Sequence, residues 1–394
     1  MSFEIPIGPQ HPIHLEPILL RLKVDGEVIV DVDVDVSYIH RGIEKALENR
    51  PYLQGLYLAE RICGICNAAH SLCFCLNVEQ LMEKDVPPRA KYLRVIVEEL
   101  SRIHSHLLWL GHYLHTLGFE TLFMYIWRDR ERVMDMLELI TGNRVTTSYN
   151  VIGGVRRDLT DEVMLKLRRA LEYIEERMKY YERVIDSEPT LLARTQEVGK
   201  LTADEAIRLG TVGPHLRASG VKHDTRKDDP YSGHDEIPFN IVTHDSGDCY
   251  GRIKVRIGEV YECINMILYA LDHLPSGDYR LKIPPIFKVP EGESLSRVEA
   301  PRGELIHYSI SDGGMKPYRY KVRTPTLANI FSVAAMLKSR EDYVAYVADV
   351  PPILGGIDPC ICCTARVMIL DEGRGRRESL TLSEIMKRYR GGKN

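Results

Sequence analysis

No long run of apolar residues occurs in this sequence of 394 amino acids. A helix that crosses a bilayer needs about 20 predominantly apolar residues in succession, and the densest apolar stretch, at residues 330–337, is far shorter. Residues 1–6 show neither the basic segment nor the apolar core of a secretory signal. The sequence therefore predicts a protein that is not exported by its own signal and that reaches a membrane only through other subunits.

An excess of basic residues is also missing. The 52 Lys and Arg residues are balanced by 56 Asp and Glu residues, which gives a formal charge of -4 at pH 7. Proteins that bind nucleic acid usually carry a basic patch, so nucleic acid is not a favoured partner. The sequence also contains no internal repeat and no low-complexity segment. It is expected to form a globular protein.

The spacing of apolar residues predicts a mainly helical protein with small β elements. Residues 19–36 alternate apolar and polar side chains around Asp25-Gly26, which indicates a β-hairpin. From residue 43 onward the spacing becomes that of amphipathic helices. Helices are expected at residues 43–61, 89–117, 130–141, 161–185, 252–274 and 327–337, and strands at 303–311 and 318–323. Thr160 is expected to cap the helix that follows it.

A single α+β domain is the expected organisation. It would comprise an N-terminal β region at 1–42, a helical core at 43–275 and a mixed region at 276–394. Within the core, residues 210–238 are rich in Gly, Pro, Asp, His and Arg and show little periodicity. A long ordered loop is expected there, and such loops in compact proteins are usually functional.

The cysteines are distributed unevenly along the chain. Seven of the nine lie in two short segments near opposite ends, and each segment contains a Cys-x-x-Cys pair, Cys63 with Cys66 and Cys360 with Cys363. A chain of this length does not need disulfides for stability, so the pattern indicates thiolate chemistry in a reducing compartment. Cys249 and Cys263 lie outside both segments and are predicted to be core residues.

Three kinds of site fit two Cys-x-x-Cys pairs: a structural zinc site, a redox-active dithiol, and a soft metal centre. Zinc ribbons and fingers close small loops, whereas most of the chain separates these two pairs. A thioredoxin-like unit does not follow the first pair, which disfavours the dithiol. If the pairs meet in the fold, they make a four-thiolate site for a soft metal.

The segments RICGIC at residues 61–66 and DPCICC at residues 358–363, with His70, together resemble the two metal-binding signatures of nickel-iron hydrogenase large subunits. The resemblance implies a Ni-Fe centre whose iron also carries carbon monoxide and cyanide. It further implies that Cys63 and Cys360 are terminal ligands of nickel, and that Cys66 and Cys363 bridge nickel and iron.

Other segments resemble the complex I subunit that lines the quinone cavity: GPQHP at 8–12, HRGIE at 40–44, and residues 210–231. Complex I subunits lack the four cysteines, so the combination resembles the energy-converting, membrane-associated nickel-iron hydrogenases. This resemblance implies a hydrogenase large-subunit fold and reversible oxidation of H2. It also implies an iron-sulfur small subunit as electron partner, complex I-like membrane and hydrophilic subunits that pump ions, and a place on the cytoplasmic side of the membrane.

Further residues receive roles from the same resemblance. Glu16 matches the glutamate that moves protons to and from a nickel-bound thiolate, a role that suits a carboxylic acid. Arg302, preceded by Pro301, matches the arginine that lies over the open face of the metals. Asp358 is expected beside that arginine, and His70 is expected to donate a hydrogen bond to a cysteine sulfur.

The sequence departs from the common hydrogenase pattern at Arg366, where many hydrogenases have a histidine. Arg366 is expected near the metals, but the resemblance then assigns no magnesium ion, and Glu44 is left as either a further metal ligand or half of an ion pair. Cys73, Cys75 and Cys362 receive no role. Two other functions remain open: a related membrane oxidoreductase that reduces sulfur compounds or quinone, and a zinc-stabilised subunit without catalytic activity.

Overall fold

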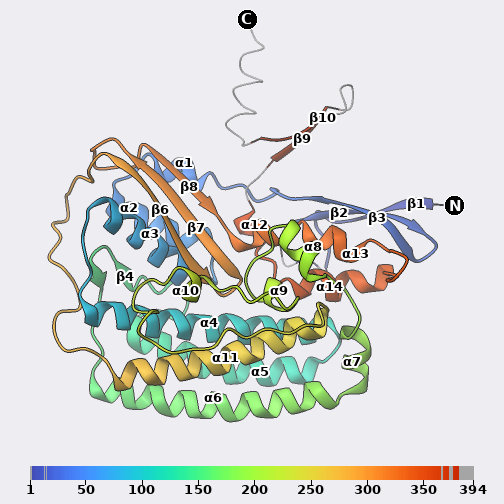
Figure 1. Ribbon diagram of the computed structural model, residues 1–394, viewed down its shortest axis with the longest axis horizontal. Helices are drawn as coiled ribbons and strands as arrows, with labels where there is room; N and C mark the ends of the chain where they lie inside the picture. The colour runs from blue at the N-terminus through green and yellow to red at the C-terminus, as the bar shows by residue number, and fades with distance from the viewer. Residues whose placement is uncertain (1, 13, 15, 365–366, 372–375, 381–394) are drawn as a thin grey trace, which may run out of the picture.

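The computed structural model describes residues 2–12, 14, 16–364, 367–371 and 376–380, and for Cys363 and the last two strands it describes the backbone. The chain opens with an antiparallel sheet of order β1-β2-β3, formed by β1 (Ser2–Ile7), β2 (Leu19–Asp25) and β3 (Val28–Asp35). The predicted hairpin is confirmed, because β2 and β3 are joined at Gly26, whose φ of 62° suits a tight turn. This sheet extends from one end of the molecule (Figure 1).

Four long helices lie side by side in one layer of the molecule (Figure 1). They are α4 (Pro88–Thr116), α5 (Glu120–Thr141), α6 (Asp161–Ser187) and α11 (Cys249–Asp272). Helix α4 buries most of its residues, whereas α6 buries a single stripe, as expected for a helix at the outer edge. Thr160 caps α6 by accepting a hydrogen bond from the Val163 amide, which confirms its predicted role.

Helix α5 begins at Glu120, well before the predicted start at residue 130. Its first turns carry Met124, Tyr125 and Trp127 on the exposed side. These exposed apolar side chains obscure the helical spacing of the buried residues Leu122 and Ile126. The prediction of a shorter helix was therefore wrong.

The predicted helix at residues 43–61 is also wrong, because Pro51 interrupts it. The structure has α1 (Ile43–Leu47), α2 (Tyr52–Ala59) and the single turn η1 (Glu60–Ile62). A proline disfavours helical conformation in the residue before it. Helix α3 (Asn67–Leu81) follows the first cysteine pair and is buried on nearly all sides, so it has little amphipathic periodicity.

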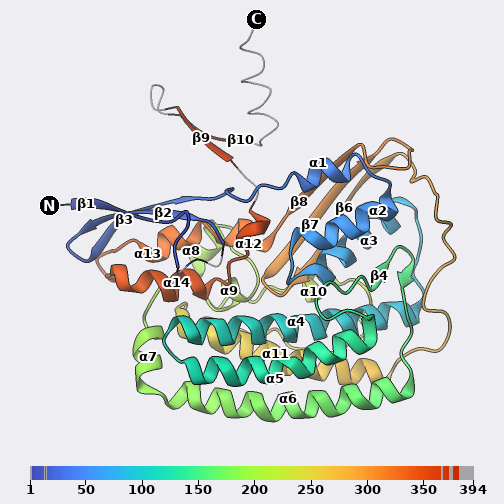
Figure 2. The ribbon, with the colours of Figure 1, turned by 180° about the vertical axis from the view of Figure 1, so that it is seen from behind.

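A second antiparallel sheet, of order β6-β7-β8, packs against α3 (Figures 1 and 2). It consists of β6 (Gly292–Ala300), β7 (Gly303–Ser311) and β8 (Arg319–Arg323). Strands β7 and β8 were predicted and β6 was not. The predicted helix at 327–337 is divided into α12 (Pro325–Asn329) and α13 (Ser332–Leu337), and α14 (Val350–Gly356) follows.

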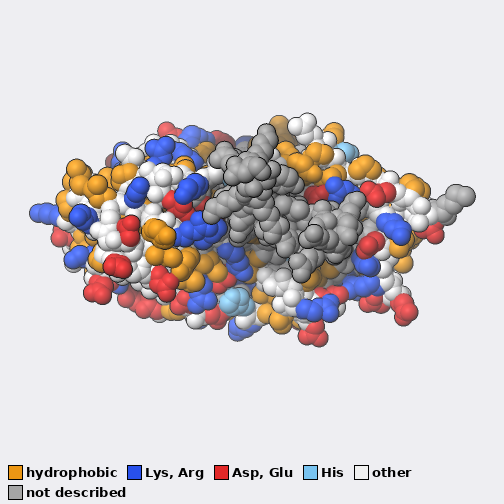
Figure 3. All heavy atoms as spheres, turned by 90° about the horizontal axis from the view of Figure 1, so that it is seen from above, with side chains coloured by type: hydrophobic (Ala, Val, Ile, Leu, Met, Phe, Trp, Pro, Cys, Tyr) orange, Lys and Arg blue, Asp and Glu red, His pale blue; other side chains and the backbone are white. Residues whose placement is uncertain are grey.

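Shorter elements complete the described chain. They are β4 (Asn150–Val151), β5 (Gly154–Val155), α7 (Pro189–Thr195), α8 (Ala203–Arg208), α9 (Pro214–Arg217), α10 (Thr225–Asp228), η2 (Val347–Asp349), η3 (Ile361–Cys363), β9 (Val367–Asp371) and β10 (Arg376–Leu380). The predicted loop at 210–238 thus contains two single-turn helices. Among the described residues, no helix is long and apolar enough to cross a membrane. The face in Figure 3 mixes acidic, basic and hydrophobic side chains.

Candidate metal centre

The first cysteine pair lies in the short connection between η1 and α3. Cys63 follows η1 in an extended conformation, and Cys66 is the residue that precedes the first turn of α3. The Cys66 amide donates a hydrogen bond to the Cys63 sulfur at 3.2 Å. Both side chains are buried. The positive end of α3 therefore lies beside the two sulfurs and favours negative charge on them.

The second segment begins after α14 and ends with η3, and it brings Cys360 to the first pair. The Sγ atoms of Cys63 and Cys360 are 3.3 Å apart although 297 residues separate them in sequence. The Cys360 amide is held by a 3.1 Å hydrogen bond to the Thr326 hydroxyl on α12. The structure thus places cysteines from both ends of the chain in one buried cluster.

Arg41 ties the two cysteine segments together. Its guanidinium donates to the carbonyl oxygens of Arg61 at 2.8 Å and Ile62 at 2.6 Å, just before Cys63. It also donates to the carbonyl of Cys362 at 3.1 Å. One planar side chain with several donors therefore fixes the spacing between two distant loops.

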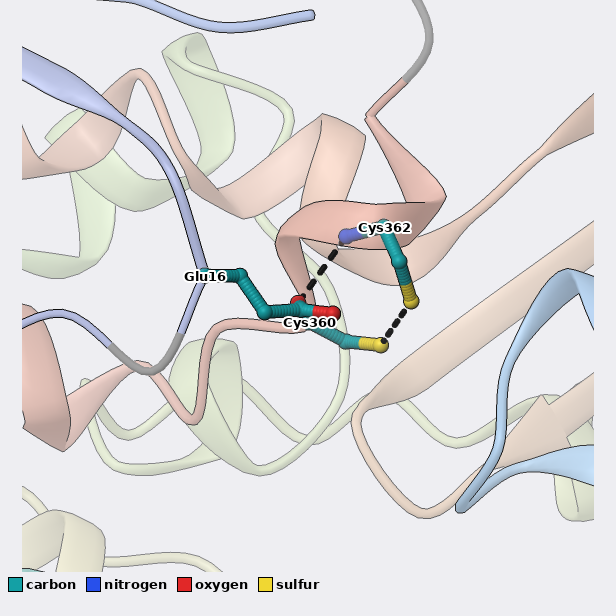
Figure 4. A group of neighbouring side chains, drawn as sticks. All are labelled: Glu16, Cys360 and Cys362. Atoms are coloured by element: carbon teal, nitrogen blue, oxygen red, sulfur yellow. Dashed lines mark hydrogen bonds between the residues drawn. The ribbon is translucent and has the colours of Figure 1, made fainter. Parts of the chain in front are cut away.

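Glu16 and Cys362 lie directly at this cluster (Figure 4). The Cys362 sulfur is 3.1 Å from the Cys360 sulfur, and the Cys362 amide donates to the Glu16 carboxylate at 2.9 Å. Ligand atoms of Glu16, Cys360 and Cys362 all lie within 4.8 Å of one another. Cys362, to which the sequence assigned no role, is therefore part of the site. The side chain of Cys363 and the whole of Arg366 fall outside the described residues.

Arg302 lies against the other side of the cysteines. One guanidinium nitrogen is 2.9 Å from the Cys66 sulfur, a second donates to the Asp358 carboxylate at 2.8 Å, and Nε donates to the Asp358 carbonyl at 2.8 Å. Asp358 adopts a left-handed backbone conformation with φ of 56°, and its Oδ2 atom has no hydrogen-bond partner among the described residues. The arginine is thus fixed over a sulfur by a buried carboxylate.

The turn that carries Arg302 connects β6 to β7 and includes the buried Pro301. Gly303 adopts a φ of 128° and approaches the backbone of residues 212 and 213 so closely that a Cβ atom would be 2.8 Å from it. Arg102 on α4 donates to the carbonyls of Glu299 and Ala300 at 2.5 and 3.1 Å. Glycine is therefore needed in the turn, and the helical layer holds the strand that leads into it.

The predicted site residues His70 and Glu44 lie in surroundings that differ from each other. His70 lies one turn beyond Cys66 in α3, and burial lowers its pKa to about 4. Glu44 is engaged away from the cysteines: its carboxylate accepts from the Val322 amide at 3.0 Å and pairs with Lys321 at 3.2 Å. Glu44 therefore joins α1 to β8 through an ion pair.

A cavity of about 280 Å³ borders the cysteines. Leu108, Trp109 and Leu354 make much of its wall apolar, and Glu16 and Arg302 face it from the side of the site. A second hollow of about 460 Å³ is lined by residues 9–12, 14, 16 and 17, so it shares His14 and Glu16 with the cavity. Glu16 therefore borders both the cavity beside the cysteines and this second hollow.

Three histidines of α4 each contact a different residue outside that helix. His104 contacts Arg130 at 2.5 Å, His106 contacts Glu259 at 2.9 Å and His115 contacts Glu120 at 2.5 Å.

The predicted core residues Cys249 and Cys263 are confirmed, because both are fully buried.

Sequence reasoning did not find Arg41, Thr326 or Asn329, which hold the loops of the site. Asn329 accepts from the Val212 amide at 2.8 Å and donates to the Arg302 carbonyl at 3.4 Å. Only Arg41 lay in a segment singled out by motif, HRGIE at 40–44. The others carry no local pattern, since their contacts are with distant backbone.

A buried cluster of thiols under a fixed arginine, at the junction of two distant loops, is suited to hold a soft metal. The model of the respiratory-chain NADH dehydrogenase 49 kDa subunit matches residues 116–286 and 281–366, and the model of nickel-dependent hydrogenases matches residues 41–170. The chain belongs to the family that joins the large subunits of nickel-iron hydrogenases to this subunit of complex I.

Similar proteins come from both branches of the family. The membrane-bound hydrogenase subunit alpha of Pyrococcus furiosus is 39% identical and is aligned over 98% of this chain and 92% of its own length. A subunit of the NADH-quinone oxidoreductase of Rhizobium etli is 39% identical over 90% and 93% of the two chains. A solved structure of an archaeal membrane-bound sulfane sulfur reductase matches with a TM-score of 0.87 and 34% identity, covering 93% of this chain and 98% of that one. These relatives are subunits of membrane complexes, which agrees with the expected complex I relationship.

Proposed function

We propose that this chain is the catalytic large subunit of a nickel-iron hydrogenase that oxidises H2 and reduces protons reversibly. The observation that carries the proposal is the 3.3 Å approach of the Cys63 and Cys360 sulfurs, together with the contact of Arg302 with the Cys66 sulfur. A buried group of thiols beside a helix N-terminus is suited to a soft metal.

The donor set fits the implied Ni-Fe centre. Cys63, Cys66, Cys360 and Cys363 would hold it, and sulfur is the ligand type that soft metals prefer. A hydrogen bond with Cys63, and then burial, raise the pKa of the Cys66 thiol, so bare thiolates would be costly here without a cation. When bound, the centre with its carbon monoxide and cyanide ligands supplies the cleavage of H2 and takes up the electrons.

Arg302 and Asp358 act as a pair beside the sulfurs. The guanidinium places fixed positive charge next to Cys66, and the carboxylate and carbonyl of Asp358 keep it in that orientation. Because the pair is buried, its charges act in a medium of low polarity and need little reorganisation. Pro301 stiffens the turn before Arg302, and His70 and Arg366 complete the polar surroundings in this proposal.

Glu16 carries protons between the cysteines and the exterior. Its carboxylate lies close to the Cys360 sulfur, and Glu16 also lines the second hollow. A carboxyl group in this position can take a proton from a sulfur on one side and release it on the other. Magnesium has no assigned place, because Glu44 is engaged by Lys321 and Val322.

The partners follow from the family. We infer that the chain forms one domain with the hydrogenase large-subunit fold, that electrons pass to an iron-sulfur small subunit, and that complex I-like subunits attach the assembly to the cytoplasmic side of the membrane and couple it to ion pumping. The similarity of both hydrogenase and quinone oxidoreductase subunits over at least 90% of the chain supports this assembly.

The decisive experiment is metal analysis of the purified complex combined with infrared spectroscopy. Nickel and iron should both be present, the infrared spectrum should show bands of carbon monoxide and cyanide, and H2 should reduce a dye acceptor. Zinc without nickel and without these bands would indicate a zinc-stabilised subunit instead.

A second candidate function is the reduction of sulfur compounds or quinone. Two observations favour it: the likeness to the sulfane sulfur reductase structure, and a cavity of about 280 Å³, which is far larger than H2 requires. The same preparation, assayed with polysulfide and with a short-chain quinone, separates the candidates. Reduction of either compound without H2 turnover would replace the hydrogenase proposal.

A further inference from the structure

Three buried polar side chains form a row that leads from the cysteine cluster into the second sheet. His70 lies on α3, His307 on β7 and Tyr320 on β8. His70 Nδ1 is 3.1 Å from His307 Nε2, and His307 Nδ1 is 2.8 Å from the Tyr320 hydroxyl. The Asn77 amide group holds the His307 carbonyl at 3.2 Å. The row is therefore continuous and fixed by regular secondary structure at both ends.

Each contact in the row shares a single proton. Two ring nitrogens 3.1 Å apart form a hydrogen bond only if one is a donor and the other an acceptor. Burial lowers the pKa of His307 well below its usual value, so its ring carries one proton near pH 7. Burial also raises the pKa of Tyr320 well above its ordinary value, so the phenol keeps its proton. The direction of one hydrogen bond thus sets the direction of the other.

Tyr320 sets that direction. Within the described part of the chain, its hydroxyl forms its hydrogen bond with His307 Nδ1, and the aromatic ring of Phe74 stacks on the same tyrosine. If the hydroxyl accepted from His307, its own proton would be buried without a partner, which is unfavourable. Tyr320 therefore donates to His307 Nδ1, and His307 donates from Nε2 to His70 Nδ1.

We infer that Tyr320 and His307 are positioning residues that hold His70 in the tautomer protonated at Nε2, so that His70 presents a hydrogen-bond donor to the cysteine sulfurs. His70 starts one helical turn beyond Cys66, whose carbonyl accepts from its amide at 3.1 Å. A donor near a thiolate withdraws electron density from sulfur and tunes a metal bound there. The inference rests on the proposed metal centre for its consequence, but the row of hydrogen bonds exists in the protein chain itself.

The tautomer can be measured in the full-length chain freed of metal. Nitrogen NMR of protein labelled with 15N-histidine distinguishes the two ring nitrogens, and the resonances that vanish in His70→Gln identify His70. The wild type should show a proton on Nε2, and Tyr320→Phe should shift His70 toward the other tautomer. Tyr52→Phe is the matched control, because Tyr52 is buried in the same hydrophobic cluster and lies outside the row. A wild-type His70 protonated at Nδ1, or a tautomer that Tyr320→Phe leaves unchanged, overturns the inference.

The metal-loaded complex provides a second readout that a purely structural role would not move. Tyr320→Phe and His307→Leu should shift the infrared band of carbon monoxide to lower wavenumber, because the sulfur then donates more electron density, at unchanged nickel content. His307→Gln can still donate to His70 and should restore part of the shift, and Tyr52→Phe should leave the band in place. Unmoved bands in both variants of the row contradict the inference. Absence of the bands from the wild type refutes the proposed function instead, and the NMR result then decides the inference alone.

Discussion

Two buried groups of charged side chains lie close together in this molecule and are satisfied very differently. The first, which we call the ionic cluster, joins the helical layer to the second sheet. It consists of Glu99, Arg102, Arg217, Asp224, Arg226, Glu259 and Glu299. The second is the proposed metal centre with Arg302 and Asp358. Both groups are buried, but of the two only the second leaves described polar atoms without partners.

In the ionic cluster the donors and acceptors are matched. Arg217 alone pairs with Asp224 at 3.3 Å, Glu259 at 2.7 Å and Glu299 at 2.9 Å. None of the cluster's described side-chain atoms is buried without a hydrogen-bond partner. At the proposed metal centre, one oxygen of Asp358 and two nitrogens of Arg256 have no partner among the described residues. Arg256 stacks on the cavity residue Trp109. The difference indicates that the cluster stabilises the fold, whereas the centre keeps capacity for a ligand.

The largest expected effect comes from the cysteines. Cys360→Ser should abolish activity and greatly reduce nickel and iron content, because serine is a harder and much less acidic donor. Cys362→Ser, two positions away and 3.1 Å from the same sulfur, should retain both metals and most of the activity. Metal content per chain and H2-dependent dye reduction are the measurements. Loss of nickel in Cys362→Ser with retention in Cys363→Ser would move the ligand assignment by one residue.

The next effect separates proton transfer from metal binding. Glu16→Gln keeps the size of the side chain and an oxygen that accepts from the Cys362 amide, but it cannot exchange a carboxyl proton. Nickel and iron content should stay near normal, while turnover and hydrogen-deuterium exchange should fall at least about 100-fold, in the range of a lost general acid or base. Full exchange with full metal would show that protons leave by another route.

Whether a feature of these two groups can be predicted from the sequence depends on how many positions along the chain separate the residues that contact each other. Helices α4, α6 and α11 and strand β7 follow from local periodicity, and the cysteine pairs were recognised because each is a short motif. Helix α3 was not predicted as a separate element because it is buried on nearly all sides, which removes the amphipathic pattern.

The residues that hold the loops of the site in place could not be predicted, because their contacts are with segments far away in the sequence. Arg41 contacts a residue 321 positions away, and Arg217 contacts one 82 positions away. Such pairs leave no spacing that a single sequence can reveal. The approach of Cys63 to Cys360 was accessible only because family resemblance supplied the expectation that the two motifs meet.

The proposed role of the ionic cluster in stabilising the fold can be tested by removing one of its paired charges. Arg217→Met should destabilise the protein by about 3–5 kcal/mol, because it leaves buried carboxylates without their cation. Denaturant unfolding of the full chain measures this. Arg144→Met is the control: Arg144 also has three acidic partners but lies at the surface, and it should unfold at nearly the same denaturant concentration as the wild type. Equal midpoints for both variants would remove the stabilising role of the cluster.

An effect that depends on pH is expected at Glu98, which lies next to the ionic cluster in sequence but outside its pairing. Its Oε2 atom is buried without a partner among the described residues, and burial raises its pKa from 4.5 to about 8. The folded state therefore holds this proton more tightly than the unfolded state does. The resulting stability is fully present below pH 4.5 and is lost as the pH rises toward 8, by at most about 1.4 kcal/mol per pH unit.

The side chain in Glu98→Gln is neutral at every pH, like the protonated acid, so the free energy of unfolding of this variant does not fall with pH in this way. The melting temperature of Glu98→Gln relative to wild type should thus increase from pH 5 to pH 8, whereas that of Glu162→Gln, an exposed residue of the first turn of α6, should not. A constant difference for Glu98→Gln would mean that this carboxyl group titrates normally, and that the unpaired oxygen is hydrated in solution.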